Sequence, residues 1–394
     1  MLECDVLVVG AGPAGASAAY KSASSGIKTI VIDKKEKIGE PVQCAEAIGK
    51  YLIQYVPFGI PKEQLIWDIK GISFYYDELK ITKIGDSWAG YSIDRRNFDK
   101  WLYNKAISAG AIGIKNCELI DLGFNDAGYA NTASIKIGKE YDEIKFKILI
   151  ACDGVFSTVR EICNLKKEKI GAIAHVYSLE MKNLDIKDPK FEQVYVGEFT
   201  PSGYAYIFPK SKKIANIGIG GIFPKKKLEY YFYEFLEIPI VKKQMKNAEI
   251  IYDKSGYAPF AGYGDEILYK NILFAGDSAN QNIKPFIEGI LPGIICGYYA
   301  GEIAASAVKN KNLLILNEYI QKINNTIGQI FQETEPLIDV MINLFQMKNK
   351  KKYYLIFGLA SNILKIDEIN VLMNKKNYEI INIIKSRLKR GRAL

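Results

Sequence analysis

The stretch that decides the fold is residues 5–33, which read DVLVVGAGPAGASAAYKSASSGIKTIVID. Residues 5–9 are a short apolar run that predicts a strand, residues 10–15 are rich in glycine and predict a turn, and residues 16–25 predict a helix. A second apolar run at residues 28–32 predicts the next strand, parallel to the first. The stretch is therefore expected to form a β-α-β unit.

The turn has the spacing G-x-G-x-x-G. Gly10 permits a tight turn, Gly12 lets the backbone approach a pyrophosphate, and Gly15 allows the helix and the strand to pack closely. The helix that follows presents free N–H groups and a positive dipole end to phosphates. Asp33 ends the second strand, where a carboxylate can accept hydrogen bonds from ribose hydroxyls. The unit predicts a bound dinucleotide but does not by itself separate FAD from NAD.

The remaining sequence falls into three regions that differ in the spacing of their apolar residues. Further helix and strand of the same domain are expected at residues 98–109 and 145–151, and a parallel strand at residues 272–276. Between residues 170 and 263, short runs of Tyr, Ile, Val and Phe alternate with Pro, Gly and Lys, which predicts an antiparallel sheet that the segment at residues 71–84 joins. From residue 313 onward, apolar positions recur with helical spacing.

These patterns predict an α/β protein with three parts. A discontinuous Rossmann-type nucleotide-binding domain is expected at residues 1–68, 93–165 and 265–310, and an antiparallel-sheet substrate domain at residues 69–92 and 166–264. Residues 311–394 are expected to form a C-terminal helical region. The sequence holds no second strand-anchored glycine motif, so a separate NAD domain is not expected.

Composition narrows the functional classes. Of 394 residues only one is histidine, His175, and the six cysteines form no CxxC pair, so a histidine triad, a metal site and a disulfide framework are not expected. The net charge of +9 comes with no nucleic-acid module, so a solvated lysine-rich surface or an acidic partner is expected instead. No signal peptide is expected, because the apolar start runs directly into the glycine motif, and the location is expected to be cytoplasmic. Residues 286–308 are apolar but contain Glu288, Pro292 and Glu302, which favours a buried helix with its entry loop over a membrane span.

Two later segments resemble motifs of the flavoprotein hydroxylases and their relatives. Residues 148–160, ILIACDGVFSTVR, resemble the Asp-Gly motif of that superfamily, and residues 274–279, FAGDSA, resemble its Gly-Asp motif. The resemblance implies that the cofactor is FAD, that Asp277 holds the flavin ribitol, and that the helix beginning at Gly289 and Ile290 points its N-terminus at the flavin ring.

Within this superfamily, most of the chain up to about residue 310 is similar to the archaeal geranylgeranyl reductases. Residues 41–46, PVQCAE, resemble the PxxC segment of that family, and residues 93–99, IDRRNFD, resemble its Arg-x-x-Phe-Asp segment. Residues 201–209, PSGYAYIFP, resemble its Tyr-x-Trp-x-Phe-Pro stretch, with Tyr206 in the place of the usual tryptophan. The resemblance implies FAD contacts at Ala14, Asp33, Cys44, Ala45, Ala47, Arg95, Leu119, Asp277, Gly289 and Ile290.

The resemblance implies an enzyme that saturates carbon–carbon double bonds of geranylgeranyl chains in archaeal lipids. Cys44, Tyr204 and Tyr206 are the candidate catalytic residues, with a bound water as a further source of the proton. The aromatic stripe of Tyr204, Tyr206 and Phe208 suits a lipid wall or ordinary core packing equally well, and Cys44 suits a flavin site or a small buried apolar position. An FAD-dependent aromatic hydroxylase and a non-catalytic carrier of lipid or electrons are the alternative functions.

The partners expected from this reading are an isoprenoid lipid and an external electron donor, a reduced nicotinamide, a deazaflavin or a ferredoxin. No nucleic acid is expected. The apolar run at residues 353–364 lies between basic runs at residues 348–352 and 385–392, and could dock the protein on the inner face of an anionic membrane. The alternative is a helical cap on the flavin domain with a solvated tail.

Overall fold

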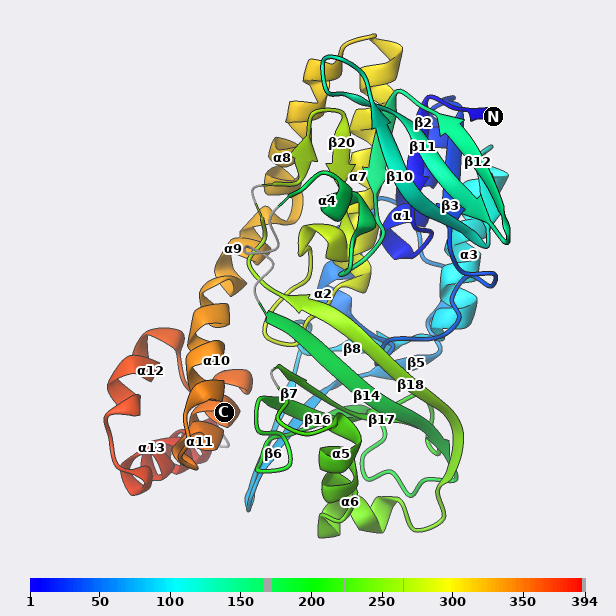
Figure 1. Ribbon diagram of the computed structural model, residues 1–394. Coiled ribbons are helices and arrows are strands. Elements are labelled where there is room, and N and C mark those ends of the chain that lie inside the picture. Colours follow the sequence, from blue (N-terminus) through cyan, green and yellow to red (C-terminus); the bar gives the residue numbers. More distant parts are fainter. Residues whose placement is uncertain (166–171, 223, 265, 392–394) are drawn as a thin grey trace.

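The computed structural model describes residues 1–165, 172–222, 224–264 and 266–391. Within these residues the strands form sheets of six, four, seven and three strands. Figure 1 shows the six-stranded and four-stranded sheets at one end of the molecule, the seven-stranded sheet at the other, and the last helices beside the latter. This architecture confirms the predicted fold class.

The six-stranded sheet, in the order β19-β20-β13-β2-β3-β9, is parallel except at β19. Its strands are β2 (Val6–Val9), β3 (Thr29–Asp33), β9 (Ile112–Lys115), β13 (Ile148–Ala151), β19 (Leu268–Tyr269) and β20 (Ile272–Phe274). The helices of this end are α1 (Pro13–Ser24), α3 (Arg95–Ser108), α4 (Thr158–Ile162) and α7 (Ile290–Lys309), with the 3₁₀ turn η3 (Gly276–Ala279). The predicted β-α-β unit is confirmed. Its helix begins three residues before the predicted start, because Pro13 occupies the first turn, where its missing N–H leaves no bond unmade.

The predicted single strand at residues 145–151 is wrong, because two strands meet there. β12 (Glu140–Lys145) ends a hairpin in a four-stranded sheet with β1 (Leu2–Glu3), β10 (Cys117–Phe124) and β11 (Ala130–Ile137), in the order β1-β12-β11-β10. The chain then crosses to the six-stranded sheet, where β13 pairs with β2 from Ile148 and Val6 onward. Phe146, at the crossing, is only 5% exposed, so the apolar pattern continues through the break.

The seven-stranded sheet has the order β18-β14-β17-β16-β15-β6-β7 and is antiparallel except between β15 and β6. Its strands are β6 (Gly71–Tyr76), β7 (Leu79–Ile84), β14 (Ala172–Lys182), β15 (Phe191–Tyr195), β16 (Gly203–Pro209), β17 (Ala215–Ile222) and β18 (Glu249–Phe260), and the helices α5 (Leu228–Leu236) and α6 (Pro239–Gln244) cover one face. The prediction that residues 71–84 join this sheet is confirmed. The predicted starts of its second segment, at residues 166 and 170, lie outside the described residues.

A small three-stranded sheet, β4-β8-β5, is formed by the chain segments that run between the six-stranded and the seven-stranded sheets. It contains β4 (Ala47–Gly49), β5 (Trp67–Ile69) and β8 (Gly90–Ser92), with α2 (Lys50–Ile53) and the 3₁₀ turn η1 (Lys62–Gln64) between them.

The C-terminal helices divide between the two ends. The segments η4 (Leu313–Asn317), α8 (Glu318–Ile323), η5 (Asn324–Gly328) and α9 (Gln329–Thr334) contribute residues up to Phe331 to the core of the six-stranded sheet. The helices α10 (Pro336–Gln346), α11 (Lys351–Ala360), α12 (Ile366–Met373) and α13 (Asn377–Gly391) instead share a core with the seven-stranded sheet. The helical prediction for this region is confirmed, but most of it caps the seven-stranded sheet and not the flavin domain.

The apolar run at residues 353–364 is not available as a membrane dock in this structure. Leu355 and Phe357 are 0% exposed and Leu364 is 1% exposed, because α11 packs its apolar residues against the seven-stranded sheet. The prediction of an apolar dock at this run is therefore wrong. Of the basic tail, Arg392 and the side chain of Arg390 lie outside the described residues.

Among the described residues, one helix is long and apolar enough to cross a bilayer, α7. In its most apolar window 78% of the residues are buried inside the protein. This agrees with the prediction of a buried helix and entry loop at residues 286–308.

Candidate active site

The three sequence motifs meet at the carboxyl edge of the six-stranded sheet. Gly10 follows β2, Cys152 follows β13 and Ala275 follows β20, and the three strands are neighbours. A Cβ atom built on Gly10, whose φ is 94°, would lie 2.3 Å from the carbonyl oxygen of Cys152. A side chain at Gly10 is therefore excluded by the neighbouring motif. In open parallel sheets, this edge is where ligands bind.

Gly12 is glycine for a different reason. It caps α1, and a Cβ built on it meets no protein atom within 4 Å. Gly15 by contrast cannot carry a side chain, because its Cβ would lie 1.7 Å from the Gly10 carbonyl oxygen. Ala14, between them, is 8% exposed. The space in front of Gly12 and the free N–H groups of the first turn fit a pyrophosphate.

Asp33 lies beside this turn at the end of β3. Its Oδ2 accepts a hydrogen bond of 2.7 Å from the Ala11 N–H, and its Oδ1 accepts one of 2.8 Å from the Lys35 N–H. Each carboxylate oxygen can accept more than one hydrogen bond. The carboxylate is therefore oriented by the backbone and still able to accept from ribose hydroxyls.

Arg160 joins the Asp-Gly motif to the Gly-Asp motif. Ser157 caps α4 by accepting a hydrogen bond of 3.1 Å from the Arg160 N–H, and Asp153 accepts one of 3.0 Å from a backbone N–H of the same helix. The Arg160 guanidinium then donates to the carbonyl oxygens of Ser278 and Glu266. Both motifs thus have a structural role in addition to any contact with a cofactor.

Asp277 faces the N-terminus of α7. A Cβ built on Gly289, which caps this helix, would lie 3.3 Å from Asp277 Oδ1, and Ile290 begins the helix. Burial raises the pKa of the Asp277 carboxyl, and the nearby Lys284 ammonium opposes that shift. Burial in turn lowers the pKa of Lys284 to about 8. A helix N-terminus with this pair beside it fits a group that gains negative charge when reduced.

Cys44 lies between the end of the molecule that holds the six-stranded sheet and the seven-stranded sheet. Its Sγ accepts a hydrogen bond of 3.2 Å from the Glu46 N–H, and the carbonyl of Ala45 accepts one of 2.8 Å from the Asn216 side chain. Ala47 then opens β4. The thiol is partly buried, beside Arg95 and the tyrosines of β16.

Arg95 begins α3, since Asp94 caps this helix by accepting a hydrogen bond from the Arg96 N–H. Its guanidinium pairs with both carboxylate oxygens of Asp99 at 2.7 Å. Burial opposes the charged form of Arg95, but Asp99 outweighs burial and raises the pKa of the guanidinium. Arg95 is therefore a permanent cation whose charge is already balanced within the protein.

A buried charge network holds the Cys44 segment in place, and nothing in the sequence spacing pointed to it. Glu46 has a φ of 65° and is 0% exposed. Its Oε2 accepts hydrogen bonds from Lys254 at 2.5 Å, Lys210 at 2.9 Å and Asn216 at 2.8 Å, and both lysines also contact Glu180 at 3.2 Å.

The network sets the charge of Glu46. Burial alone would raise the pKa of this carboxyl, but Lys254 and Lys210 outweigh burial and lower it to about 2. The remaining oxygen, Oε1, accepts a hydrogen bond of 2.8 Å from the Arg95 N–H. Glu46 therefore ties the Cys44 segment both to α3 and to the seven-stranded sheet.

The stripe of Tyr204, Tyr206 and Phe208 lies on the sheet face that α10–α13 cover. The rings of Tyr206 and Phe208 are 4.6 Å apart, and the Tyr204 hydroxyl donates a hydrogen bond of 3.1 Å to the carbonyl of Phe286, in the loop before α7. Burial raises the pKa of both tyrosine hydroxyls. The stripe therefore extends an apolar face up to the loop where the flavin ring is expected.

Leu119 lies apart from these groups. It is 5% exposed on β10, within the core of the flavin end, so any contact with a cofactor would come from its backbone. Cys296 is 0% exposed inside α7.

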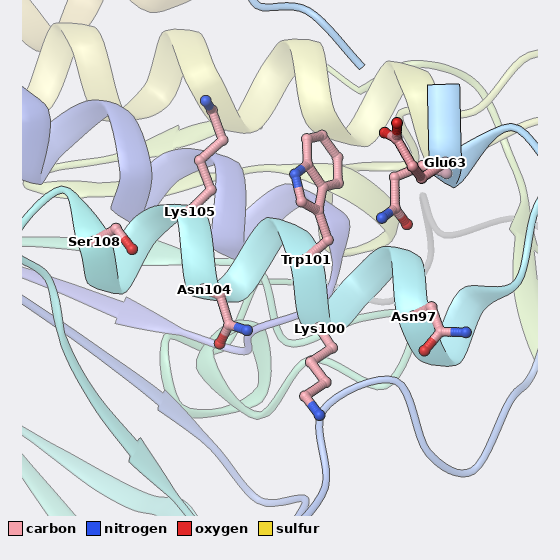
Figure 2. Close-up of a pocket in the computed structure, with 8 residues that line it drawn as sticks. Glu63, Asn97, Lys100, Trp101, Asn104, Lys105 and Ser108 are labelled. Carbon is pink, nitrogen blue, oxygen red and sulfur yellow. The ribbon is translucent and has the colours of Figure 1, made fainter. Parts of the chain in front are cut away.

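A surface depression between α3 and η1 is a poor alternative site. Figure 2 shows its lining residues, which are Glu63, Gln64, Asn97, Lys100, Trp101, Asn104, Lys105 and Ser108. The lining is mostly polar, which is unsuited to an isoprenoid chain, and none of the residues predicted to bind the flavin or the lipid belongs to it.

Known proteins are similar to this chain in sequence and in fold. The chain is 40% identical to the digeranylgeranylglycerophospholipid reductase of Methanocaldococcus jannaschii over 311 residues, 77% of this chain and 78% of the relative. Its structure is similar to that of a geranylgeranyl bacteriochlorophyll reductase-like protein of Thermoplasma acidophilum, with a TM-score of 0.82 and 25% identity over 98% of this chain and 100% of the other. A flavin-dependent brominase has the same fold, with a TM-score of 0.69 and 17% identity over 98% of this chain and 100% of the other.

Family models agree with these matches. The model of the geranylgeranyl reductase catalytic domain matches residues 173–257, and that of glucose inhibited division protein A matches residues 5–201. These matches identify an oxidoreductase with the fold of flavin-dependent enzymes. Within that class, the chain belongs to the geranylgeranyl reductase family, with the digeranylgeranylglycerophospholipid reductases as relatives.

Proposed function

We propose that this chain is an FAD-dependent reductase that saturates carbon–carbon double bonds in the geranylgeranyl chains of archaeal membrane lipids or their precursors. The observation that carries the proposal is the meeting of two surfaces. The glycine turn at residues 10–15 and the N-terminus of α7 lie at the carboxyl edge of the six-stranded sheet. The aromatic stripe of the seven-stranded sheet reaches the loop before α7, because the Tyr204 hydroxyl donates a hydrogen bond to the Phe286 carbonyl. A lipid alkene and a flavin ring could therefore meet there.

The proposed FAD site begins at the glycine turn. The N–H groups at the start of α1 would bind the pyrophosphate in front of Gly12, and Asp33 would accept from a ribose. Asp277 would hold the ribitol, and the N-terminus of α7 would stabilise negative charge on the ring. The remaining contacts proposed from the family resemblance are Gly10, Ala14, Gly15, Cys44, Ala45, Ala47, Arg95, Leu119, Gly289 and Ile290.

Saturation of a carbon–carbon double bond requires a hydride at one carbon and a proton at the other. Bound in its reduced form, FAD supplies a hydride to one alkene carbon. An isoprenoid alkene carries no electron-withdrawing group to stabilise a carbanion, so a proton must reach the other carbon in the same step. Cys44, Tyr204 and Tyr206 are proposed to line the reacting centre, with the aromatic stripe excluding water.

The proposed reaction also requires an external electron donor that reduces the flavin. A reduced nicotinamide, a deazaflavin or a ferredoxin is the expected source of electrons, and the net charge of +9 suits an acidic donor protein. The lipid must come from a bilayer. With the run at residues 353–364 buried, contact with the membrane is proposed to be electrostatic, through exposed lysines of α13 such as Lys385 and Lys389.

The test is an anaerobic single turnover. Protein reduced with dithionite is mixed with a geranylgeranyl lipid, and flavin absorbance and lipid mass are followed. Reoxidation of the flavin with a gain of about two daltons per bond, one hydride and one proton, is expected. Reoxidation that needs oxygen and gives a hydroxylated product would establish an aromatic-hydroxylase type of activity, and no turnover of any alkene would establish a carrier.

A further inference from the structure

One buried carboxyl on the lipid-facing sheet is not used by the site described above. Glu192, on β15, is 7% exposed. Two residues further on, Val194 pairs with Tyr206 of β16 and with Phe74 of β6, and all three belong to the core under α10–α13. Since side chains two residues apart point to the same face of a strand, Glu192 also points to that face.

Among the described residues, Glu192 differs from the buried Glu46 and Glu180 and from the half-buried Glu288 in its lack of a partner. Glu46 and Glu180 contact lysines, and Glu288 accepts two hydrogen bonds, at 2.6 Å from the Gly49 N–H and at 3.1 Å from the Tyr51 hydroxyl. In the part of the chain that the structure describes, no cation and no hydrogen-bond donor contacts the Glu192 carboxyl. A buried carboxylate without partners is costly, so such a group keeps its proton.

The neighbours of Glu192 reinforce this state. Burial and, to a smaller extent, the carboxyl of Glu288 together raise the pKa of Glu192 to about 8. Burial also raises the pKa of Glu288, and its hydrogen bonds from Gly49 and Tyr51 oppose that shift without cancelling it. Among the described residues, Tyr204 is a further titratable group near Glu192, and Tyr51 contacts Glu288. Of the two carboxyls, Glu288 has donors that favour its charged form and Glu192 has none, so Glu192 keeps its proton more readily.

We propose that Glu192 is the acid that protonates the alkene, an assignment that rests on the proposed function. In the step, the alkene π electrons take the proton of the Glu192 carboxyl at one carbon, and its O–H bond breaks. The other carbon takes the hydride, so the reduced flavin loses two electrons and the alkene gains them. Glu192 is left as a carboxylate and recovers a proton from water. Tyr204 and Tyr206 are weaker acids, because burial raises the pKa of their hydroxyls further.

The first test needs no turnover. The infrared spectrum of wild-type protein with oxidised FAD is compared with that of Glu192→Gln at a series of pH values. In the difference spectrum of wild type minus Glu192→Gln, a C=O band of a protonated carboxylic acid is expected at pH 7 and is lost with a midpoint near 8 as pH rises. Absence of this band from the difference spectrum at pH 7 overturns the assignment.

The second test measures single-turnover reoxidation by a geranylgeranyl lipid. Glu192→Gln is expected to slow it by about a hundredfold or more while FAD stays bound. Glu192→Asp, which keeps an acid, should recover part of the rate. The wild-type rate should fall above about pH 8, where the acid is lost, and the residual rate of Glu192→Gln should not. The control is Glu118→Gln, an exposed glutamate of β10.

The outcomes separate the two proposals. If the wild type reduces the lipid and Glu192→Gln does so at the same rate, the proposed function stands and the role of Glu192 is refuted. If the wild type reduces no geranylgeranyl lipid, the proposed function fails and the role of Glu192 fails with it, even if the infrared band titrates as expected. A variant that loses FAD is replaced by Glu192→Asp, whose rate and spectrum then decide.

Discussion

Replacing Glu46 by glutamine should destabilise the protein in a way that depends on pH. The pKa of Glu46 falls from an ordinary value of 4.5 to about 2 on folding. At about 1.4 kcal/mol per pH unit, that difference corresponds to about 3 kcal/mol of stability. The variant also leaves Lys210 and Lys254 to share Glu180, and removing one partner from a buried ion pair costs about 3–5 kcal/mol.

The sign of the pH effect follows from the lowered pKa. The contribution of Glu46 is fully present above pH 4.5 and is lost as pH falls toward 2, because the proton then binds the folded and unfolded states alike. Glu46→Gln lacks this contribution at every pH. The difference in the free energy of unfolding between wild type and variant should therefore be largest near pH 7 and shrink below pH 4.5.

The assay is urea unfolding of the FAD-loaded protein, followed by circular dichroism and by flavin fluorescence, at pH values from 7 down to 3. The control is Glu237→Gln, which removes the exposed pair with Lys242 and should change stability by less than about 1 kcal/mol. A loss of under 1 kcal/mol for Glu46→Gln at pH 7 would refute the reasoning, as would a difference that grows on acidification.

Three further predictions concern ligands. Gly12→Val should abolish FAD binding while the protein without FAD stays folded, because a Cβ at position 12 meets no protein atom but would occupy the space for the pyrophosphate. The control Gly59→Ala, at an equally open position, should keep FAD, and flavin absorbance of the purified variants distinguishes the two outcomes. Cys44→Ser should keep FAD and lose most turnover, because the hydroxyl is less acidic and less polarizable than the thiol; near-wild-type kinetics would reduce Cys44 to packing. Liposome flotation should require anionic lipid, weaken with salt and drop when Lys385 and Lys389 become glutamine, whereas equal flotation with neutral liposomes would contradict an electrostatic contact.

Local patterns in the sequence were enough to predict the β-α-β unit of the six-stranded sheet. The β-α-β unit depends on contacts between residues close in the chain, and only the first turn of α1 was missed, because Pro13 was read as part of the loop. The prediction of one strand at residues 145–151 was wrong for a physical reason. Buried strands of two different sheets give the same apolar pattern, and only pairing with β2 and β11 separates them.

The site was less accessible to prediction, because its geometry comes from long-range contacts. Glu46 meets Lys210 and Lys254 across 164 and 208 residues, and none of the three stands in a spacing that indicates an ion pair. The face that Glu192 shares with Tyr206 depends on strand order in the sheet. The apolar run at residues 353–364 indicated that this segment has an apolar face, but the sequence did not show that the seven-stranded sheet covers that face.

The buried network at Glu46 holds the Cys44 segment at the junction of the two halves of the molecule. Glu46 is bonded to Lys254, Lys210 and Asn216 of the half with the seven-stranded sheet. It is also bonded, through the Arg95 N–H, to α3 of the other half. If the two halves separated to admit a lipid, one of these two sets of bonds would have to break, so the network that positions the thiol would also resist such an opening.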